Sequence, residues 1–184
     1  MQKGFFIMKN FLGLKKLNVR ELCVLGLLTA LTVVLAICCT FRIGNAIKIP
    51  LKFITVFLTS VAFGPVWGGI VAALGDILNS VLVPVGAPLP QITIIEFVYG
   101  FIFGLFFYRY SSKYFLKTII CSLILCVIDI SVVSYILTSV GYFPALTVAI
   151  TTRATATIIK FFVYILTLLF LKKYLNTFER LINK

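Results

Sequence analysis

Six long apolar segments constrain the fold of this chain more than any other feature. Most are close to, or longer than, the roughly 20 residues that a helix needs to cross a bilayer. A mean hydropathy of +1.15 with only 12% charged residues excludes a soluble domain with a covered core. We therefore predict an all-α integral membrane protein, a six-transmembrane-helix bundle with both termini cytoplasmic. The segments are Leu22–Phe41, Ile49–Phe63, Val66–Val83, Ile92–Tyr108, Phe115–Thr138 and Ala145–Leu171.

Turn-forming residues separate several of these segments. Gly64-Pro65 follows the second segment, residues 84–90 with their three prolines follow the third, and residues 141–144 follow the fifth. The second segment is the shortest and contains Lys52, so we expect its helix to be tilted or partly re-entrant. We expect a single membrane domain over residues 1–184. It comprises a basic cytoplasmic N-terminal segment at 1–21, the six-helix bundle at 22–171 and a basic cytoplasmic tail at 172–184.

The distribution of basic residues predicts the orientation in the membrane. Of the 17 Lys and Arg residues, twelve fall on one side of the predicted membrane, and the positive-inside rule makes that side the cytoplasm. We expect a multi-pass protein of the cell membrane, whose net charge of +12 reflects this topology and not a nucleic-acid partner. The twelve are Lys3, Lys9, Lys15, Lys16, Arg20, Arg109, Lys113, Lys117, Lys172, Lys173, Arg180 and Lys184.

The chain has few residues of the kinds that enzymes and metal sites use. It has no His, and its five Cys lie in apolar segments without a C-x-x-C spacing, so we expect neither a metal site nor a disulfide. No glycine-rich phosphate loop and no nucleophile–base pair is recognisable. We therefore expect no catalytic residues and no cofactor. The carboxylates inside the apolar segments leave a proton relay or intramembrane acid–base chemistry as an alternative.

Five ionisable residues lie inside the apolar segments. An ionised group at bilayer depth costs at least roughly 2.5–3.5 kcal/mol unless it faces a partner or a wet cavity. Five such groups in so short a chain therefore indicate a shared polar interior. They are Asp76, Glu96, Asp129, Arg153 and Lys160.

Polar residues recur in three of the segments at spacings of three, four or seven. Such spacings place them on one face of each helix. These faces carry Asp76 with Asn79, Glu96 with Tyr99, and Arg153 with Thr157 and Lys160.

Two interpretations of these polar faces stay open. One is internal salt bridges, such as Asp129 with Lys160 or Glu96 with Arg153, and the other is contact with a polar ligand. Both can hold at once, but apolar side chains would pack the helices without the cost of desolvation, which favours a ligand for part of the set. We expect Asp129 and Lys160 to form the structural pair, and Asp76, Glu96 and Arg153 to face an outward cavity.

Three bases lie in or beside the first outer loop, where the positive-inside rule disfavours them. We expect no acid to offset these bases, which are Arg42, Lys48 and Lys52. These bases predict that an anionic solute is attracted to an outward-facing opening of the bundle. The alternative is a solvated loop with lysines that snorkel at the membrane edge.

Pairs of small residues at a spacing of four occur in two segments. Gly26 and Ala30 in the first segment form a surface that another helix can approach closely, and Gly100 and Gly104 in the fourth are of the same type. We expect the second pair to pack inside the bundle.

The chain resembles the substrate-binding S components of energy-coupling factor (ECF) vitamin transporters, and among them the folate-specific family. The similarity extends over essentially the whole chain and is most specific over residues 50–110. It is carried by Phe63-Gly-Pro-Val-Trp-Gly-Gly69 and Ala73-Leu-Gly-Asp76, by Pro84-Val-Gly86 and Pro90-Gln-Ile-Thr93, and by Gly100-Phe-Ile-Phe-Gly104 with Tyr108-Arg109.

The resemblance implies a subunit that captures folate, or a related small-molecule vitamin, from the outside and has no ATPase of its own. A transmembrane coupling protein and two cytoplasmic ATPase subunits would complete the transporter, in contact with membrane lipid. Gly26 and Ala30 match the family's Ala-xxx-Ala docking motif, with Gly in place of the first Ala. The resemblance also favours an outer lid at residues 84–90 over a simple tight connection.

Folate chemistry suggests roles for the polar residues. Its pterin offers adjacent N–H donors that Asp76 or Glu96 would accept, and its glutamate tail carries two carboxylates that suit bases. The predicted substrate-binding set is Arg42, Lys48 and Arg153 for the tail, Tyr99 and Phe103 for stacking, and Asp76, Glu96, Asn79 and Thr157 for polar contacts. The alternatives are an S component for another vitamin or precursor, such as pantothenate or a queuosine precursor, and a self-sufficient proton-coupled carrier.

Overall fold

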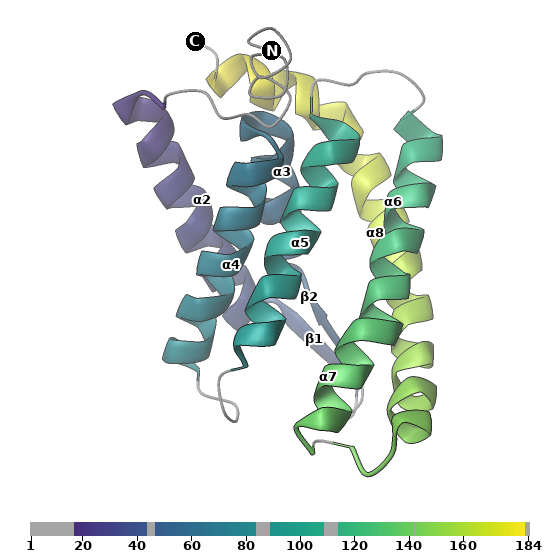
Figure 1. Ribbon diagram of the computed structural model, residues 1–184. Coiled ribbons are helices and arrows are strands. Elements are labelled where there is room, and N and C mark those ends of the chain that lie inside the picture. The colour runs from purple at the N-terminus through teal and green to yellow at the C-terminus, as the bar shows by residue number, and fades with distance from the viewer. Residues whose placement is uncertain (1–16, 44–46, 84–88, 109–113, 142, 183–184) are drawn as a thin grey trace, which may run out of the picture.

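The computed structural model describes residues 17–43, 47–83, 89–108, 114–141 and 143–182. Within these ranges the chain is helical apart from one short hairpin (Figure 1). The elements are α2 (Val19–Cys38), β1 (Thr40–Ile43), β2 (Ile47–Pro50), α3 (Phe53–Phe63), α4 (Pro65–Leu82), α5 (Pro90–Phe107), α6 (Tyr114–Ile128), the π-helix η1 (Asp129–Val133), α7 (Ser134–Ser139) and α8 (Leu146–Ile182).

Six helical spans therefore follow one another in the described residues, as the apolar segments predict. Five of them are long and apolar enough to cross a membrane, counting α6, η1 and α7 as one continuous span, Tyr114–Ser139. The exception is α3, whose 11 residues reach about 16 Å, roughly half of a hydrocarbon core. The outward faces are apolar, with Leu27, Val81 and Leu166 each at least 70% exposed, which suits a lipid environment.

Local chemistry explains where several helices begin. At α2, Asn18 and Glu21 form a capping box, in which the Asn18 backbone N–H donates to the Glu21 carboxylate over 2.9 Å. Gly64 has a φ of 100°, which favours glycine, and it separates α3 from α4. Pro65 occupies the first turn of α4, where its missing N–H costs no hydrogen bond.

A hairpin between α2 and α3 corrects two predicted boundaries. Strands β1 and β2 pair antiparallel, with Arg42 opposite Lys48 and Phe41 opposite Ile49. Phe41 and Ile49, the predicted ends of two helical segments, belong instead to strands. The reason is that this stretch alternates apolar and polar residues with a period of two, which suits a strand better than a helix.

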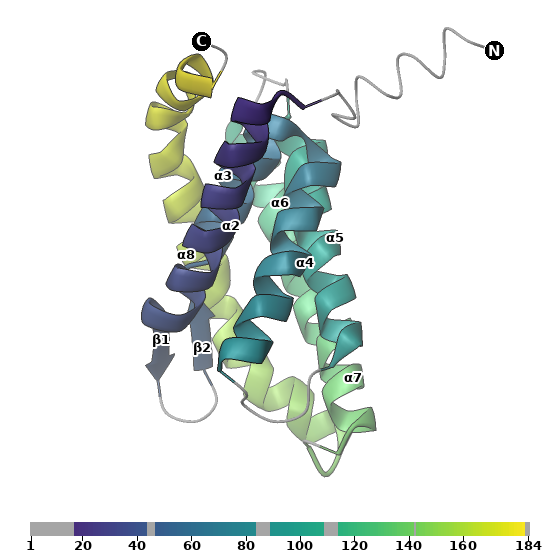
Figure 2. The same cartoon turned by 90° about the vertical axis from the view of Figure 1, so that its left-hand side faces the viewer.

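The last helix is longer than its apolar segment. Although the predicted tail starts at residue 172, α8 runs on to Ile182 without a break. The start of α2 and the end of α8 lie at the same end of the bundle (Figures 1 and 2). With the twelve bases of the positive-inside argument, this end is the cytoplasmic one.

The helices form two groups. In the first group α4 packs against α2, α3 and α5, and in the second α6, η1 and α7 pack against α8. Contacts between the groups are fewer and run from α3 to α8 and from α5 to α6, while β2 also touches α8 (Figure 1).

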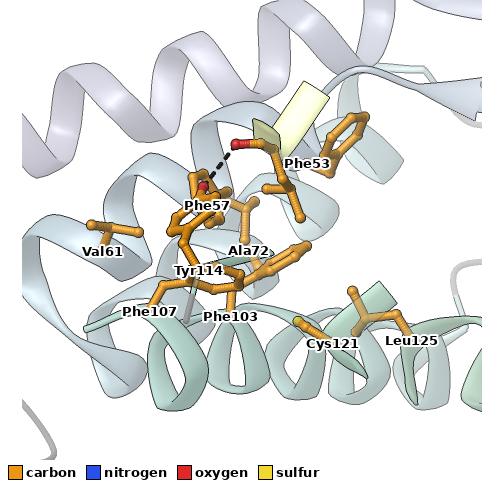
Figure 3. Packing of buried hydrophobic residues seen from close by; sticks show 11 residues of the cluster. Phe53, Phe57, Val61, Ala72, Phe103, Phe107, Tyr114, Cys121 and Leu125 are labelled. Atoms are coloured by element: carbon orange, nitrogen blue, oxygen red, sulfur yellow. Dashed lines mark hydrogen bonds between the residues drawn. The ribbon is translucent and has the colours of Figure 1, made fainter. Parts of the chain in front are cut away.

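The main hydrophobic core lies where the two groups meet, toward the cytoplasmic end. Phe57 packs edge-on against Phe103 and Phe107, at centroid distances of 5.7 and 5.1 Å (Figure 3). The buried Tyr114 at the start of α6 donates a 2.7 Å hydrogen bond to the Leu168 carbonyl on α8, which joins both helices to this core.

Close contact between α4 and α5 depends on glycine. A Cβ atom built on Gly100 would collide with the Gly68 carbonyl oxygen, and one on Gly104 would collide with Pro65. The Ser60 hydroxyl of α3 also donates to the Gly100 carbonyl over 2.8 Å. The prediction that Gly100 and Gly104 pack inside the bundle is therefore confirmed.

Candidate functional site

Three ionic side chains from three helices of the first group form one cluster, which we call the Lys52 triad. The Lys52 ammonium lies 2.9 Å from Glu96 Oε1 and 3.3 Å from Asp76 Oδ1. Thr93 donates to the second Asp76 oxygen over 3.0 Å. Lys52 immediately precedes α3, Asp76 lies in α4 and Glu96 in α5, so the triad joins the outer halves of these helices.

A second cluster, the Asp129 triad, lies within the second group. Arg153 donates to Asp129 Oδ1 over 2.8 Å, and Lys160 donates to Oδ2 over 2.9 Å. The Thr157 hydroxyl also approaches Oδ2, at 3.3 Å. The three α8 residues share one face because they follow the i, i+4, i+7 spacing.

The Asp129 triad coincides with an irregularity in its helix. Asp129 is the first residue of η1, the five-residue π-helical stretch that interrupts α6 and α7. A π-helical turn inserts an extra residue into a helix and is frequent at functional sites. Because the turn is wider, it shifts the helix face on which the side chains after Asp129 lie; Val133 and Ser134 are both buried.

The two triads carry opposite formal charges. The Lys52 triad has one ammonium and two carboxylates, hence −1, and the Asp129 triad has one carboxylate and two bases, hence +1. All six side chains are 10–19% exposed, with Glu96 the most exposed at 19%. The whole arrangement is thus neutral but polarised between the two helix groups.

Tyr99 lies near both triads. It is three residues after Glu96 on α5, and its hydroxyl interacts electrostatically with Glu96, Asp129 and Arg153. That hydroxyl has no hydrogen-bond partner among the described residues. Glu96 and Tyr99 thus lie on one face of α5, as predicted, and Tyr99 is close to both ionic clusters.

The ion pairs confirm one predicted pairing and overturn two statements. The pair of Asp129 and Lys160 is confirmed. The alternative pair of Glu96 and Arg153 is wrong, because Glu96 binds Lys52 and Arg153 binds Asp129. The view that no acid offsets Lys52 is also wrong: two acids from later helices reach it, and it is a buried residue and not a solvated loop base.

The other residues predicted to contact a ligand differ in burial and in their place in the fold. Thr157 is buried and belongs to the Asp129 triad, and Asn79 is half-buried one turn after Asp76. Phe103 is 2% exposed in the main core, a position typical of packing. Arg42 and Lys48 are paired positions in the backbone register of the hairpin. Contact of each of these residues with a ligand stays a prediction.

Some predicted features lie outside the described residues. The proposed lid falls largely on residues 84–88, which the structure does not describe. The same holds for Arg109 and for most of the basic segment 1–21.

The predicted docking residues lie on the surface of α2. Gly26 and Ala30 are both exposed, and a Cβ atom on Gly26 would meet nothing within 4 Å. This contrasts with Gly100 and Gly104, where no side chain fits. The small residues of α2 therefore face away from the bundle, and their role in docking stays a prediction.

Sequence reasoning missed Lys52 and Thr93 as members of the polar interior. A signal for Lys52 existed, because a base at the outer end of the second segment shares its depth with acids in the outer halves of the next two. For Thr93, the available sequence signal was its spacing of three residues from Glu96. Within the described residues, no group of three or more Cys, Asp and Glu could hold a metal ion.

Comparison with known proteins decides the family. The family model described as "ECF-type riboflavin transporter, S component" matches residues 16–176. The chain belongs to this family of ECF S components. A search of curated protein sequences gave no match.

A solved S component has the same fold. The crystal structure of FolT bound with folic acid superposes with a TM-score of 0.75 at 27% sequence identity, covering 84% of this chain and 93% of FolT. The all-helical membrane fold predicted from the sequence is thereby confirmed. As an S component, the protein is a multi-pass transport subunit of the cell membrane.

Proposed function

We propose that this S component captures folate on the extracellular side for ATP-driven uptake. The observation that carries the assignment is its likeness to FolT, whose structure holds folic acid. The polarised pair of triads supports it independently, since folate has N–H donors at one end and two carboxylates at the other.

The triads suggest an orientation for the vitamin. In the net negative Lys52 triad, Glu96 is the most exposed acid and has one oxygen on Lys52, so it retains acceptor capacity for the pterin donors. In the net positive Asp129 triad, Arg153 and Lys160 share a single carboxylate. Their combined charge favours the anionic glutamate tail near this end.

Riboflavin is the second candidate because the matching family model is described by that vitamin. Riboflavin has no carboxylate, so the net positive Asp129 triad attracts it less strongly than it attracts folate. Capture of riboflavin would instead rely on ring carbonyls and ribityl hydroxyls. A direct comparison of the two vitamins therefore separates the candidates.

We further propose that the subunit acts with a transmembrane coupling protein and two cytoplasmic ATPase subunits. The exposed Gly26 and Ala30 provide a surface on α2 that a partner helix can approach closely. This surface begins near the cytoplasmic end of the bundle, on the side where ATPase subunits would lie.

The experiment is a titration of the purified chain in detergent with folic acid and, separately, with riboflavin. Binding is read by calorimetry, with the intrinsic fluorescence of Trp67 as a second signal. We expect saturable folate binding below micromolar concentration and weaker binding of riboflavin. Absence of folate binding in this range, or tighter binding of riboflavin, contradicts the folate assignment.

A further inference from the structure

Two buried polar atoms near the triads lack a hydrogen-bond partner among the described residues. They are the hydroxyl of Tyr99 on α5 and Nε of Arg153 on α8, each with less than 1 Å² of accessible surface. Buried donors without partners are destabilising and rare in native proteins. Two of them in one region therefore call for a partner.

The three carboxylates of the triads, those of Asp76, Glu96 and Asp129, accept hydrogen bonds from neither of these two atoms. Asp129 receives Arg153 on one oxygen and Lys160 on the other, and Asp76 receives Lys52 and Thr93. An arginine Nε can only donate, and a tyrosine hydroxyl near carboxylates is also a ready donor. Both orphaned atoms thus suit an acceptor oxygen supplied from outside the chain.

The two atoms belong to different helix groups, so an oxygen that accepts from both would connect the groups. Tyr99 belongs to the first helix group and Arg153 to the second, and the ion pairs of each triad form within one group. The described contacts between the groups are fewer than those within each group. A shared acceptor would therefore add a polar connection between α5 and α8.

We propose that Tyr99 Oη and Arg153 Nε both donate to one carbonyl or carboxylate oxygen of the bound solute, so that the solute links α5 to α8. This inference rests on the proposed function as a solute-capturing subunit. It assigns Tyr99 a hydrogen bond in addition to the ring stacking expected from the sequence. Folic acid and riboflavin both carry oxygens of the required kind.

The test compares Tyr99→Phe with the unchanged protein and with Tyr114→Phe as the matched control. Each substitution removes one phenolic hydroxyl, but that of Tyr114 is bonded to Leu168 in the cytoplasmic-side core. Titration with folic acid and riboflavin gives the affinities, and thermal unfolding without solute gives the stability.

We expect Tyr99→Phe to bind the solute roughly 3- to 10-fold more weakly, as for loss of one hydrogen bond, while its solute-free melting temperature does not fall. Tyr114→Phe should show the reverse, a lower melting temperature with unchanged affinity. Hydrogen–deuterium exchange should show that solute protects both α5 and residues 147–160 of α8 in the unchanged protein.

Equal affinity of the variant, solute protection of a single helix group, and binding of neither vitamin would each overturn the proposal. Equal affinity of Tyr99→Phe and the unchanged protein shows that the hydroxyl does not contact the solute. Solute protection confined to one helix group shows that no link forms. If the unchanged protein binds riboflavin and not folate, the folate assignment falls, and the Tyr99 inference is judged by its effect on riboflavin; binding of neither vitamin contradicts both.

Discussion

The backbone of Gly100 on α5 packs directly against the Gly68 carbonyl on α4. A Cβ atom at position 100 would overlap that oxygen, and one at Gly68 would overlap the side chain of Ser60 on α3. Three helices thus meet at a point where only hydrogen atoms fit. This junction holds together the group that carries the Lys52 triad.

Gly100→Ala should therefore destabilise the bundle by at least about 1–3 kcal/mol, the usual cost of overpacking a tight interior. The obstruction is backbone, which cannot move aside as a flexible side chain does. Thermal unfolding in detergent measures the effect. Gly26→Ala is the matched control, because no atom lies within 4 Å of its Cβ and Ala favours a helix; an equal loss at both positions would contradict the packing argument.

Replacing Lys52 by Met should be more severe than its position at a helix start suggests. The change leaves Asp76 and Glu96 largely buried without their cation, and loss of one partner of a buried ion pair typically costs about 3–5 kcal/mol. The yield of folded, monodisperse protein and its melting temperature report this cost.

Two comparisons test the Lys52 prediction. Lys173→Met removes the same charge from an exposed position and should change little. Adding Glu96→Gln to Lys52→Met should restore part of the stability, because it removes one uncompensated charge. A double variant no better than the single one would argue against the triad.

Asp129→Asn should leave Arg153 and Lys160 as adjacent cations without a counterion. We expect a loss of stability of similar size, about 3–5 kcal/mol, with partial recovery in the double variant Asp129→Asn with Lys160→Met. A double-mutant cycle on melting temperature and denaturant midpoint measures the coupling. Strict additivity of the two changes would show that the pair contributes nothing.

Gly26→Trp should abolish co-purification with the coupling protein and ATPase subunits but leave solute affinity unchanged. A large side chain on the exposed small-residue surface prevents close approach of a partner helix, whereas the triads lie on other helices. Val81→Trp is the control, since Val81 is 72% exposed at the outer end of α4. Retention of the partners by Gly26→Trp would exclude docking through this surface.

The apolar pattern was sufficient to predict the number and order of the spans, because the bilayer imposes a minimum length on each helix. The apolar pattern misplaced the junction of the first two spans, because apolar content alone does not distinguish the strand residues Phe41 and Ile49 from helix ends. Alternation around Arg42 and Lys48, with glycine and asparagine between the two runs, was the available signal for a hairpin.

The polar interior was predictable as a set but not as specific pairs. Depth and helix face brought Asp129 and Lys160 together correctly, because both follow from topology. Depth also brings Lys52 near Asp76 and Glu96, but the specific pairing with Glu96 depends on how α3 packs against α4 and α5. Nor does any residue pattern reveal the π-helix at Asp129, which contacts α8.

The pairing of Lys52 also has a consequence for biosynthesis. The base leaves the ribosome beside a helix too short to span the bilayer alone, whereas its acids follow 24 and 44 residues later. Until α4 and α5 have entered the membrane, the ammonium has no counterion in the bilayer and must stay at the aqueous surface. We therefore expect the second helix to be synthesised to take its final position only after α4 and α5 have entered the bilayer.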